Sequence, residues 1–244
     1  MENKRSWIPI AVAVVAIAAI GGGYWYLRRP AAPPPQQPAQ PQAQAPKAPD
    51  APLPPSEKSD SQMRKDLASL STLPEWAQWL GVSDLLDRFV VFVDNVAEDV
   101  SPRKQLDFIN LTPQKSERLE TGRYDRIVAV IASVDAKGAA QVVRDMHPLL
   151  ETAYRKLGYP DRKFDQVAAK ALQRIIDAPV VEKPVRLVPK GANNFGFEDE
   201  KLEAQGPVEK LLLRMGPKNT KLLQNKAREL AAALDLRVAQ QRKP

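Results

Sequence analysis

Carboxylates and tyrosines gather in one stretch of the chain and could carry acid–base chemistry. Glu151, Asp161 and Asp165 accompany Tyr154 and Tyr159, and glycoside hydrolysis uses two carboxyl groups at a defined separation. A structural interpretation is simpler, because Asp161 and Asp165 are suited to capping a helix start and stabilising its positive end. We therefore predict no catalytic residue, with an enzyme that cleaves glycan or peptide through carboxylates as an alternative.

Metal and thiol chemistry lacks the side chains that it needs. The chain has one histidine, His147, and no cysteine, so neither a histidine-based metal cluster nor a Cys–His pair can be assembled within it. No glycine-rich phosphate loop followed by Lys and Ser or Thr occurs in the sequence. We predict a structural role for His147, no metal site and no cofactor.

Two turns hold the most unusual local chemistry. One is Tyr159-Pro160-Asp161, and the other is the corner at Gly216-Pro217, where one helix stops and the next begins. A plain helix–helix corner explains the second turn. The alternative is a positively charged surface for a partner or an anionic polymer, because free backbone N–H groups at a helix start favour anions. The candidate binding residues on the two turns are Arg214, Lys218, Asn219, Lys221, Tyr159 and Asp161.

An uncharged stretch near the N-terminus predicts a membrane anchor. Residues 7–27 contain no charged side chain, and Lys or Arg flanks them on both sides. At a rise of about 1.5 Å per residue a helix here is roughly 30 Å long, which matches the hydrocarbon core of a bilayer. A cleaved signal peptide is the competing interpretation, but it needs a shorter apolar run and a small-residue cleavage site. We predict a stub at residues 1–6 and a transmembrane helix at residues 7–27, which makes the membrane a partner.

The orientation of this span does not follow from its flanking charges, since two Lys or Arg residues lie close to each end. A short basic stub before a long body favours a cytoplasmic N-terminus and an exported body, because long domains cross membranes largely regardless of charge. The opposite orientation would make the body a membrane-tethered adaptor that faces the cytoplasm.

A biased segment at residues 28–58 follows the span. Between Pro30 and Pro55 it holds 11 Pro, 7 Ala and 5 Gln in 26 residues. This composition lacks backbone donors and bulky apolar side chains, so it cannot offset the entropy of folding. We predict a disordered, extended linker that reaches at most about 80 Å at roughly 3.1 Å per residue.

The rest of the chain predicts a mainly α-helical globular domain at residues 59–237 and a tail at residues 238–244. Apolar residues at helical spacing indicate about nine helices. Alternation over Val180–Pro189, and again at Phe195 and Phe197, predicts a small β-hairpin packed on the helices. Of the chain's net charge of +7, the part from Ser56 onward carries only +4, with both signs interspersed, so we expect no nucleic-acid partner.

Capping residues predict where the first helices begin. Asp60 or Ser61 is expected to cap the first helix. Ser83 or Asp84 is expected to cap the next long helix, whose wide apolar face over residues 85–97 predicts the centre of the core.

Breaks in the later helices follow from proline and glycine. Pro148 predicts an interruption at His147. Gly216 predicts an interruption in the last helical segment, which then runs from Pro217 to about Arg237 with Leu222 among its inward residues.

Four stretches of the body form a recognisable series. They are Asp94-Asn95-Val96-Ala97 with Ser101-Pro102-Arg103, Arg123-Tyr124-Asp125, Leu157-Gly158-Tyr159-Pro160-Asp161 with Phe164-Asp165, and Leu213-Arg214-Met215-Gly216-Pro217-Lys218-Asn219 before Gln224-Asn225-Lys226. After one span and a Pro-rich linker, this series resembles the bacterial proteins grouped as domain of unknown function 3014, from about Ser59 to Leu234. The resemblance implies a single-span envelope protein of the inner membrane, and it implies no activity and no functional residue.

These features together predict a non-catalytic periplasmic binding or scaffolding domain on a long spacer, with another envelope protein or a cell-wall component as its partner. The alternatives predict different features in the body. An enzyme should hold at least two carboxyl groups of raised pKa in one cleft. An adaptor should show an exposed patch that is apolar or that carries charges of one sign.

Overall fold

The computed structural model describes residues 56–109, 111, 114, 116–191 and 194–238. The predicted stub at residues 1–6, the transmembrane helix at 7–27, nearly all of the linker at 28–58 and most of the tail lie outside these residues. Among the helices of the described part, none combines the length and the apolar character that a bilayer crossing requires.

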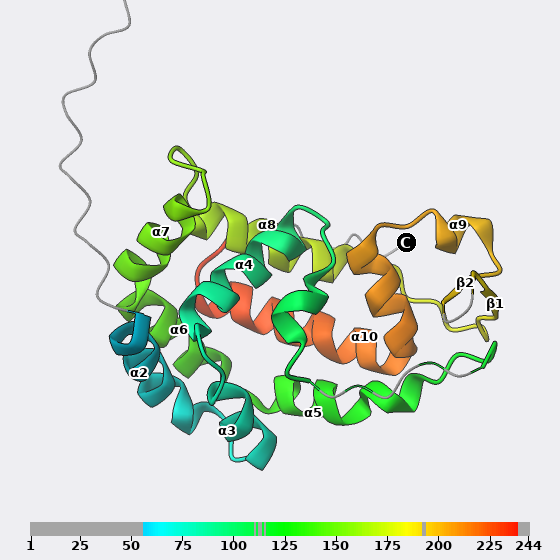
Figure 1. Ribbon diagram of the computed structural model, residues 1–244, viewed down its shortest axis with the longest axis horizontal. Helices are drawn as coiled ribbons and strands as arrows, with labels where there is room; N and C mark the ends of the chain where they lie inside the picture. Colours follow the sequence, from blue (N-terminus) through cyan, green and yellow to red (C-terminus); the bar gives the residue numbers. More distant parts are fainter. Residues whose placement is uncertain (1–55, 110, 112–113, 115, 192–193, 239–244) are drawn as a thin grey trace, which may run out of the picture. The chain divides into compact units, whose positions relative to one another are not determined.

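The described part is mainly helical with one small hairpin, which confirms this part of the predicted fold class (Figure 1). Three short 3-10 helices and one two-stranded sheet accompany the α-helices. In chain order the elements are α2 (Ser56–Leu67), η1 (Ala68–Leu70), α3 (Pro74–Leu80), α4 (Leu85–Ala97), η2 (Pro102–Leu106), η3 (Thr121–Tyr124), α5 (Asp125–Ser133), α6 (Ala136–Asp145), α7 (His147–Lys156), α8 (Phe164–Asp177), β1 (Leu187–Pro189), β2 (Phe195–Phe197), α9 (Glu200–Glu203) and α10 (Pro207–Ala233).

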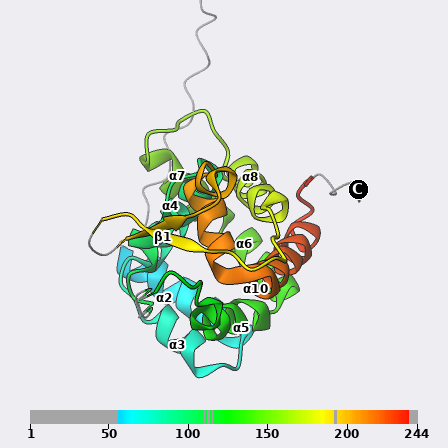
Figure 2. The same cartoon turned by 90° about the vertical axis from the view of Figure 1, so that its right-hand side faces the viewer.

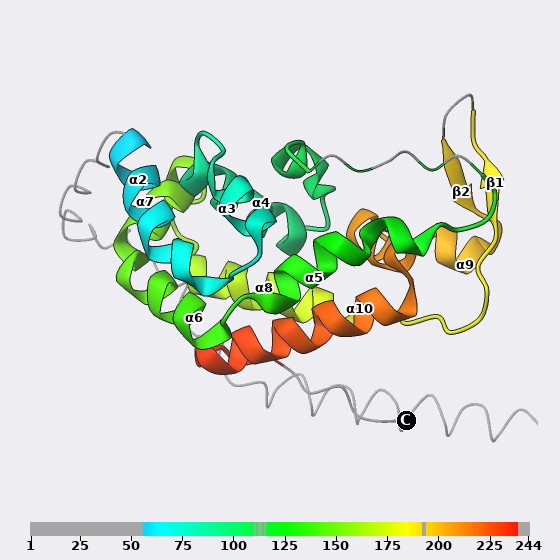
Figure 3. The ribbon, with the colours of Figure 1, turned by 90° about the horizontal axis from the view of Figure 1, so that it is seen from below.

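Helix α4 lies at the centre of the main core, as its wide apolar face predicts. It packs against α2, α7 and α8, while α10 packs against α8, α5 and α6. Figure 3 shows α5 and α10 running side by side, with α6 beside the end of α10. The apolar face of α4 supplies the buried side chains of Leu86, Val90, Val93, Val96 and Ala97.

The side chain that caps α4 comes from another helix, and not from Ser83 or Asp84 as expected. Asp84 occupies the N-cap position, but its backbone is left-handed (φ 55°) and its side chain makes no capping bond, whereas a capping residue normally has extended backbone. Instead Asp60, which lies inside α2 and is only 5% exposed, accepts hydrogen bonds from the N–H groups of Leu85 (3.0 Å) and Leu86 (3.1 Å). The predictions for both caps were therefore wrong, and Asp60 ties α2 to the core.

The predicted hairpin is present but its first strand is shorter than expected. β1 and β2 pair antiparallel, with Leu187 opposite Phe197, at the end of the molecule that faces the viewer in Figure 2. Leu187, Phe197 and Leu213 of α10 form a second small core. Helix α9 was not predicted; it begins after Asp199, whose carboxylate accepts from the N–H groups of Lys201 and Leu202.

The predicted interruption in the last helix is confirmed. Gly216 has φ 80° and ψ 167° inside α10, and Pro217 follows it. The row that faces the core after this kink is Thr220, Gln224, Ala227 and Ala231. Because a helix repeats every 3.6 residues, Leu222 does not belong to that row. It is 38% exposed, so its predicted inward position was wrong.

Candidate functional site

The residues predicted at the Gly216-Pro217 corner do not form one surface. Asn219 is 2% exposed, and its amide donates to Asp125 (2.8 Å) and to the carbonyl of Met215 (3.0 Å). Lys218 pairs with Asp125 at 3.6 Å, and Lys221 pairs with Glu182. Asn219 and Lys218 therefore hold the start of α5 against α10, and carboxylates neutralise both lysines.

Arg214, the remaining corner residue, points to the hairpin instead. Its Nη2 donates to the carbonyl of Phe195 at 2.7 Å, and its guanidinium carbon lies 5.0 Å from the centre of the Phe197 ring. Burial lowers the pKa of the Arg214 guanidinium, and the nearby charges of Arg103 and Arg123 lower it further. The charges of Tyr124 and Glu203 oppose this decrease. We call Arg214 and the two arginines whose charges act on it, Arg103 and Arg123, the arginine cluster.

Three separate segments position this cluster. Arg103 is exposed on η2. The buried Pro102 anchors η2, which packs against α4. Arg123 lies on η3, where the buried Tyr124 follows it and where the side chain of Thr121 fits against Gly216. The close approach of η3 to the α10 kink therefore brings Arg123 near Arg214.

Arg123 is fixed by an aromatic ring and by one weak hydrogen bond. Its guanidinium carbon lies 5.1 Å from the centre of the Tyr124 ring, and its Nη1 donates to the side-chain oxygen of Gln114 at 3.4 Å. Its Nε is buried and makes no hydrogen bond. Within the described residues, no ion pair involves any of the three arginines.

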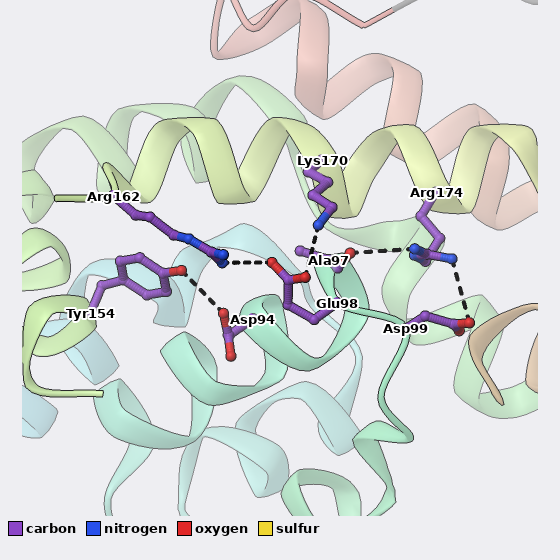
Figure 4. Close-up of polar contacts among 8 residues, drawn as sticks. All are labelled: Asp94, Ala97, Glu98, Asp99, Tyr154, Arg162, Lys170 and Arg174. Carbon is purple, nitrogen blue, oxygen red and sulfur yellow. Dashed lines mark hydrogen bonds and ion pairs between the residues drawn. The ribbon is translucent and has the colours of Figure 1, made fainter. Parts of the chain in front are cut away.

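The junction of α4 and α8 shows the opposite situation, because its charges are matched (Figure 4). Glu98 accepts from Arg162 at 2.8 Å and from Lys170 at 2.9 Å. Arg174 lies 3.7 Å from Asp99, and the same guanidinium donates to Glu209 of α10 at 2.7 Å. This α4–α8 ion-pair junction joins three helices through complementary charges.

Tyr159 and Asp161, the candidates on the other turn, have different surroundings and do not form one site. Tyr159 stacks on the fully buried Tyr154, with ring centres 5.4 Å apart, and Arg162 lies over its ring at 4.8 Å. Asp161 is exposed. This turn packs beside the start of α8, and the contacts of Tyr159 are those of a packing residue.

The Tyr154 hydroxyl donates to Asp94 at 3.1 Å. Burial raises the pKa of Asp94, and the Tyr154 hydrogen bond opposes that rise. Burial also raises the pKa of Tyr154 to about 12. The pKa of Glu98 is lowered, chiefly by the hydrogen bond from Lys170. A protonated tyrosine with so high a pKa is a hydrogen-bond donor at neutral pH and no base.

The raised pKa of Tyr154 predicts a loss of stability in alkali. Above pH about 10 the unfolded chain releases the proton while the folded chain keeps it up to pH about 12. Titration of Tyr154 therefore leaves the free energy of unfolding unchanged below pH about 10. Above that pH it lowers this free energy by at most about 1.4 kcal/mol per pH unit. Urea unfolding between pH 9.5 and about 12 should show a shallower decline for Tyr154→Phe. Equal slopes in the two proteins would contradict the assignment.

The carboxylates near His147 form local structure, but not as predicted. The N–H of Phe164, at the start of α8, donates to Glu151 of α7 at 2.9 Å; neither Asp161 nor Asp165 supplies this cap, which corrects the expectation. Asp165 does lie in the first turn of α8, and His147 lies 3.2 Å from it. His147 thus connects the starts of two helices.

Arg103 and Arg123 are absent from the predicted binding set, although both lie in the four stretches quoted above. Their presence beside Pro102 and Tyr124, two anchoring residues, is the signal that could have indicated them. Their proximity to Arg214 could not be predicted, because about one hundred residues separate η2 and η3 from α10.

The fold and the charged side chains define a helical domain with a charge-paired junction between α4 and α8. The model of the family described as Protein of unknown function (DUF3014) matches residues 85–231, so the chain belongs to this family, and the predicted resemblance is confirmed. The matched region runs from the start of α4 to near the end of α10. No curated protein and no solved structure matches the chain.

Proposed function

We propose that this protein is a non-catalytic binding or scaffolding domain, held on a long spacer by a single-span anchor in the inner membrane. In this proposal the anchor is residues 7–27, the spacer is residues 28–58, and the body works in the periplasm on an envelope protein or a cell-wall component. The arginine cluster is the surface that recognises an anionic group of that partner.

One observation carries the proposal: within the described residues the arginines of the cluster form no ion pair, whereas the cations of the α4–α8 junction do. Like charges held together disfavour one another, and Arg214 is partly buried as well. At the junction, every arginine and lysine named above has a carboxylate within 4.0 Å. An anion bound at the cluster would supply the charge-assisted hydrogen bonds that the described protein groups do not supply.

The carboxyl groups lend less support to the enzyme alternative. That alternative needs two carboxyls of raised pKa in one cleft. Asp94 has a raised pKa because of its burial, but hydrogen bonds lower the pKa of Glu98 beside it. Asp94 accepts a hydrogen bond from Tyr154 at the contact between α4 and α7, which favours a structural role for this carboxylate.

The adaptor alternative uses the same surface of positive charges. It differs from the proposal only in placing the body on the cytoplasmic side of the membrane. The short basic stub and the long body favour export. Alkaline phosphatase fused after Pro244 is expected to be active in intact cells. An inactive phosphatase together with a bright cytoplasm-only fluorescent fusion would contradict the periplasmic location.

Anion recognition can be tested with a matched pair of variants. Arg103→Gln and Lys104→Gln remove one exposed positive charge each, but Lys104 lies beside Asp84, Asp87 and Arg88. On a heparin column, which presents sulfate and carboxylate groups, the full-length protein in neutral detergent should elute at lower salt only when Arg103 is changed. Equal shifts for the two variants would show general charge attraction and contradict the proposed surface.

A further inference from the structure

An open cavity lies where the chain after α10 meets the end of α6 and the first turns of α7 and α8. Figure 3 shows α6 beside this end of α10. The cavity has a volume of about 330 Å³, which is within the range of about 300–1,000 Å³ that small-ligand pockets span. None of its lining residues belongs to the arginine cluster, so this cavity is separate from the surface proposed above.

The chain after α10 supplies part of an apolar wall. Asp235 has a left-handed backbone (φ 55°), and the N–H of Leu236 donates to the carbonyl of Ala231 at 2.9 Å, as in the common motif that ends a helix with a left-handed residue. This turn leaves both Leu234 and Leu236 on the cavity. Five of the eight lining residues are apolar, so the cavity suits a ligand with an apolar body.

Arg144 supplies a positive charge at the cavity. Its Nη1 donates to the carbonyl of Ala233 at 2.9 Å, and its Nη2 donates to the side-chain oxygen of Gln141 at 3.1 Å. Within the described residues it forms no ion pair. Because a guanidinium carries five N–H donors, Arg144 is held in place by two of them and keeps the others for a ligand.

The opposite charge comes from three side chains around His147. Its Nε2 lies 3.2 Å from Oδ2 of Asp165 and 3.6 Å from Oε1 of Glu151. Two carboxylates share one imidazole, so the group is net negative whether or not the ring is protonated. Asp165 lines the cavity, and among the described residues its second oxygen accepts no hydrogen bond. The cavity therefore offers a free cation and a free carboxylate oxygen beside apolar side chains.

We propose that this cavity binds a free α-amino acid with an apolar side chain. The carboxylate of the ligand pairs with Arg144, its ammonium group pairs with Asp165, and its side chain contacts Leu234 and Leu236. A fatty acid would leave Asp165 without a cation, and an apolar amine would leave Arg144 without an anion. Only a zwitterion with an apolar body satisfies both charges and the apolar wall. The site goes beyond the proposed function and does not depend on it.

The ligand class can be tested with leucine and three analogues that each lack one of its groups. Isocaproate lacks the ammonium group, isoamylamine lacks the carboxylate, and glycine lacks the apolar side chain. Titration calorimetry of the full-length protein in neutral detergent, at equal ionic strength, measures the four affinities. We expect leucine to bind at least tenfold more tightly than each analogue, on the order expected for one charge-assisted hydrogen bond or for the burial of a leucine side chain.

Two variants test which side chain meets which group of the ligand. Arg144→Gln should weaken leucine binding by about tenfold and change isoamylamine binding by less than about twofold. Asp165→Asn should weaken the binding of leucine and of isoamylamine by about tenfold and leave isocaproate unchanged. Arg237→Gln and Asp161→Asn are the matched controls, because both residues are exposed and neither lines the cavity. Urea unfolding of all four variants checks that the fold is intact.

The outcomes separate this site from the arginine cluster. Leucine that binds no more tightly than isocaproate or isoamylamine would overturn the proposal, and so would equal losses in the cavity variants and their controls. Either result would leave the heparin prediction for Arg103→Gln untouched, since Arg103 does not line this cavity. Conversely, a failed heparin prediction together with selective leucine binding would refute only the anion-binding surface.

Discussion

Replacing Arg174 with methionine is expected to lower the free energy of unfolding by about 3 kcal/mol. The Arg174 guanidinium lies 2.7 Å from the carboxylate of Glu209 and 3.7 Å from that of Asp99, and the Glu209 side chain is only 15% exposed. Methionine fills similar space but carries no charge. It would leave a buried carboxylate without a cation, which costs far more than an exposed ion pair contributes.

The position of Asp99 adds to this effect. Its other carboxylate oxygen accepts from the N–H of Val208 at 3.1 Å, in the first turn of α10. Arg174 therefore holds in place the side chain that caps this helix. Loss of the arginine should loosen the contact between the end of α4 and the start of α10.

Lys170→Met is the matched control, because Lys170 lies on the same helix and also pairs with a carboxylate of the junction. Its partner Glu98 keeps Arg162, and the Lys170 side chain is largely exposed, so the expected loss is below about 1 kcal/mol. Adding Glu209→Gln to Arg174→Met should recover part of the stability, since it removes the unpaired charge. Urea unfolding followed by circular dichroism measures all four proteins. Equal losses for the Arg174 and Lys170 variants would contradict the role of burial.

Periodicity and local breaking residues predict the helices well, because both act over a few neighbouring residues. The apolar row of residues 85–97 becomes the buried face of α4. Helix α7 begins at His147, directly before Pro148, and Gly216, with φ 80°, marks the kink in α10. In each case the deciding contact lies within one or two helical turns.

Contacts between distant segments decide what periodicity cannot predict. Asp60 caps α4 and Glu151 caps α8, each from a different helix. Thr220 and Gln224 occupy core positions of α10 although they are polar. Thr220 donates to the carbonyl of Leu212 next to the kink, and Gln224 donates to two carbonyls near the end of α8.

The same distinction separates the candidate residues. The predicted corner residues Lys218 and Asn219 are neighbours in sequence, but their partner Asp125 comes from another helix and occupies them with structure. Arg214 belongs to the arginine cluster only because the fold brings the charges of η2 and η3 to act on α10. A charge pattern along the chain gives the number of cations, whereas the fold determines which of them have carboxylate partners.

Replacing Gly216 with alanine is expected to lower the free energy of unfolding by about 3 kcal/mol. Two separate effects contribute. The backbone at φ 80° and ψ 167° lies in a region that residues with a side chain rarely adopt. In addition, the new Cβ would stand 2.5 Å from the Cγ2 atom and 3.0 Å from the Cβ atom of Thr121, so η3 would have to move away from α10.

Two other glycines separate these effects. Gly158 has φ 101° but open space around its Cβ position, so Gly158→Ala should cost about 1–2 kcal/mol from backbone strain alone. Gly122, on η3, has neither a positive φ nor a neighbour within 4 Å of a Cβ, and Gly122→Ala should change stability by less than about 0.5 kcal/mol. Because Gly216→Ala displaces η3, it should also move Arg123 away from Arg214 and weaken retention on heparin, which Gly158→Ala should leave unchanged. A Gly216→Ala protein that is no less stable than Gly158→Ala, with normal retention, would show that the kink does not hold the arginine cluster together.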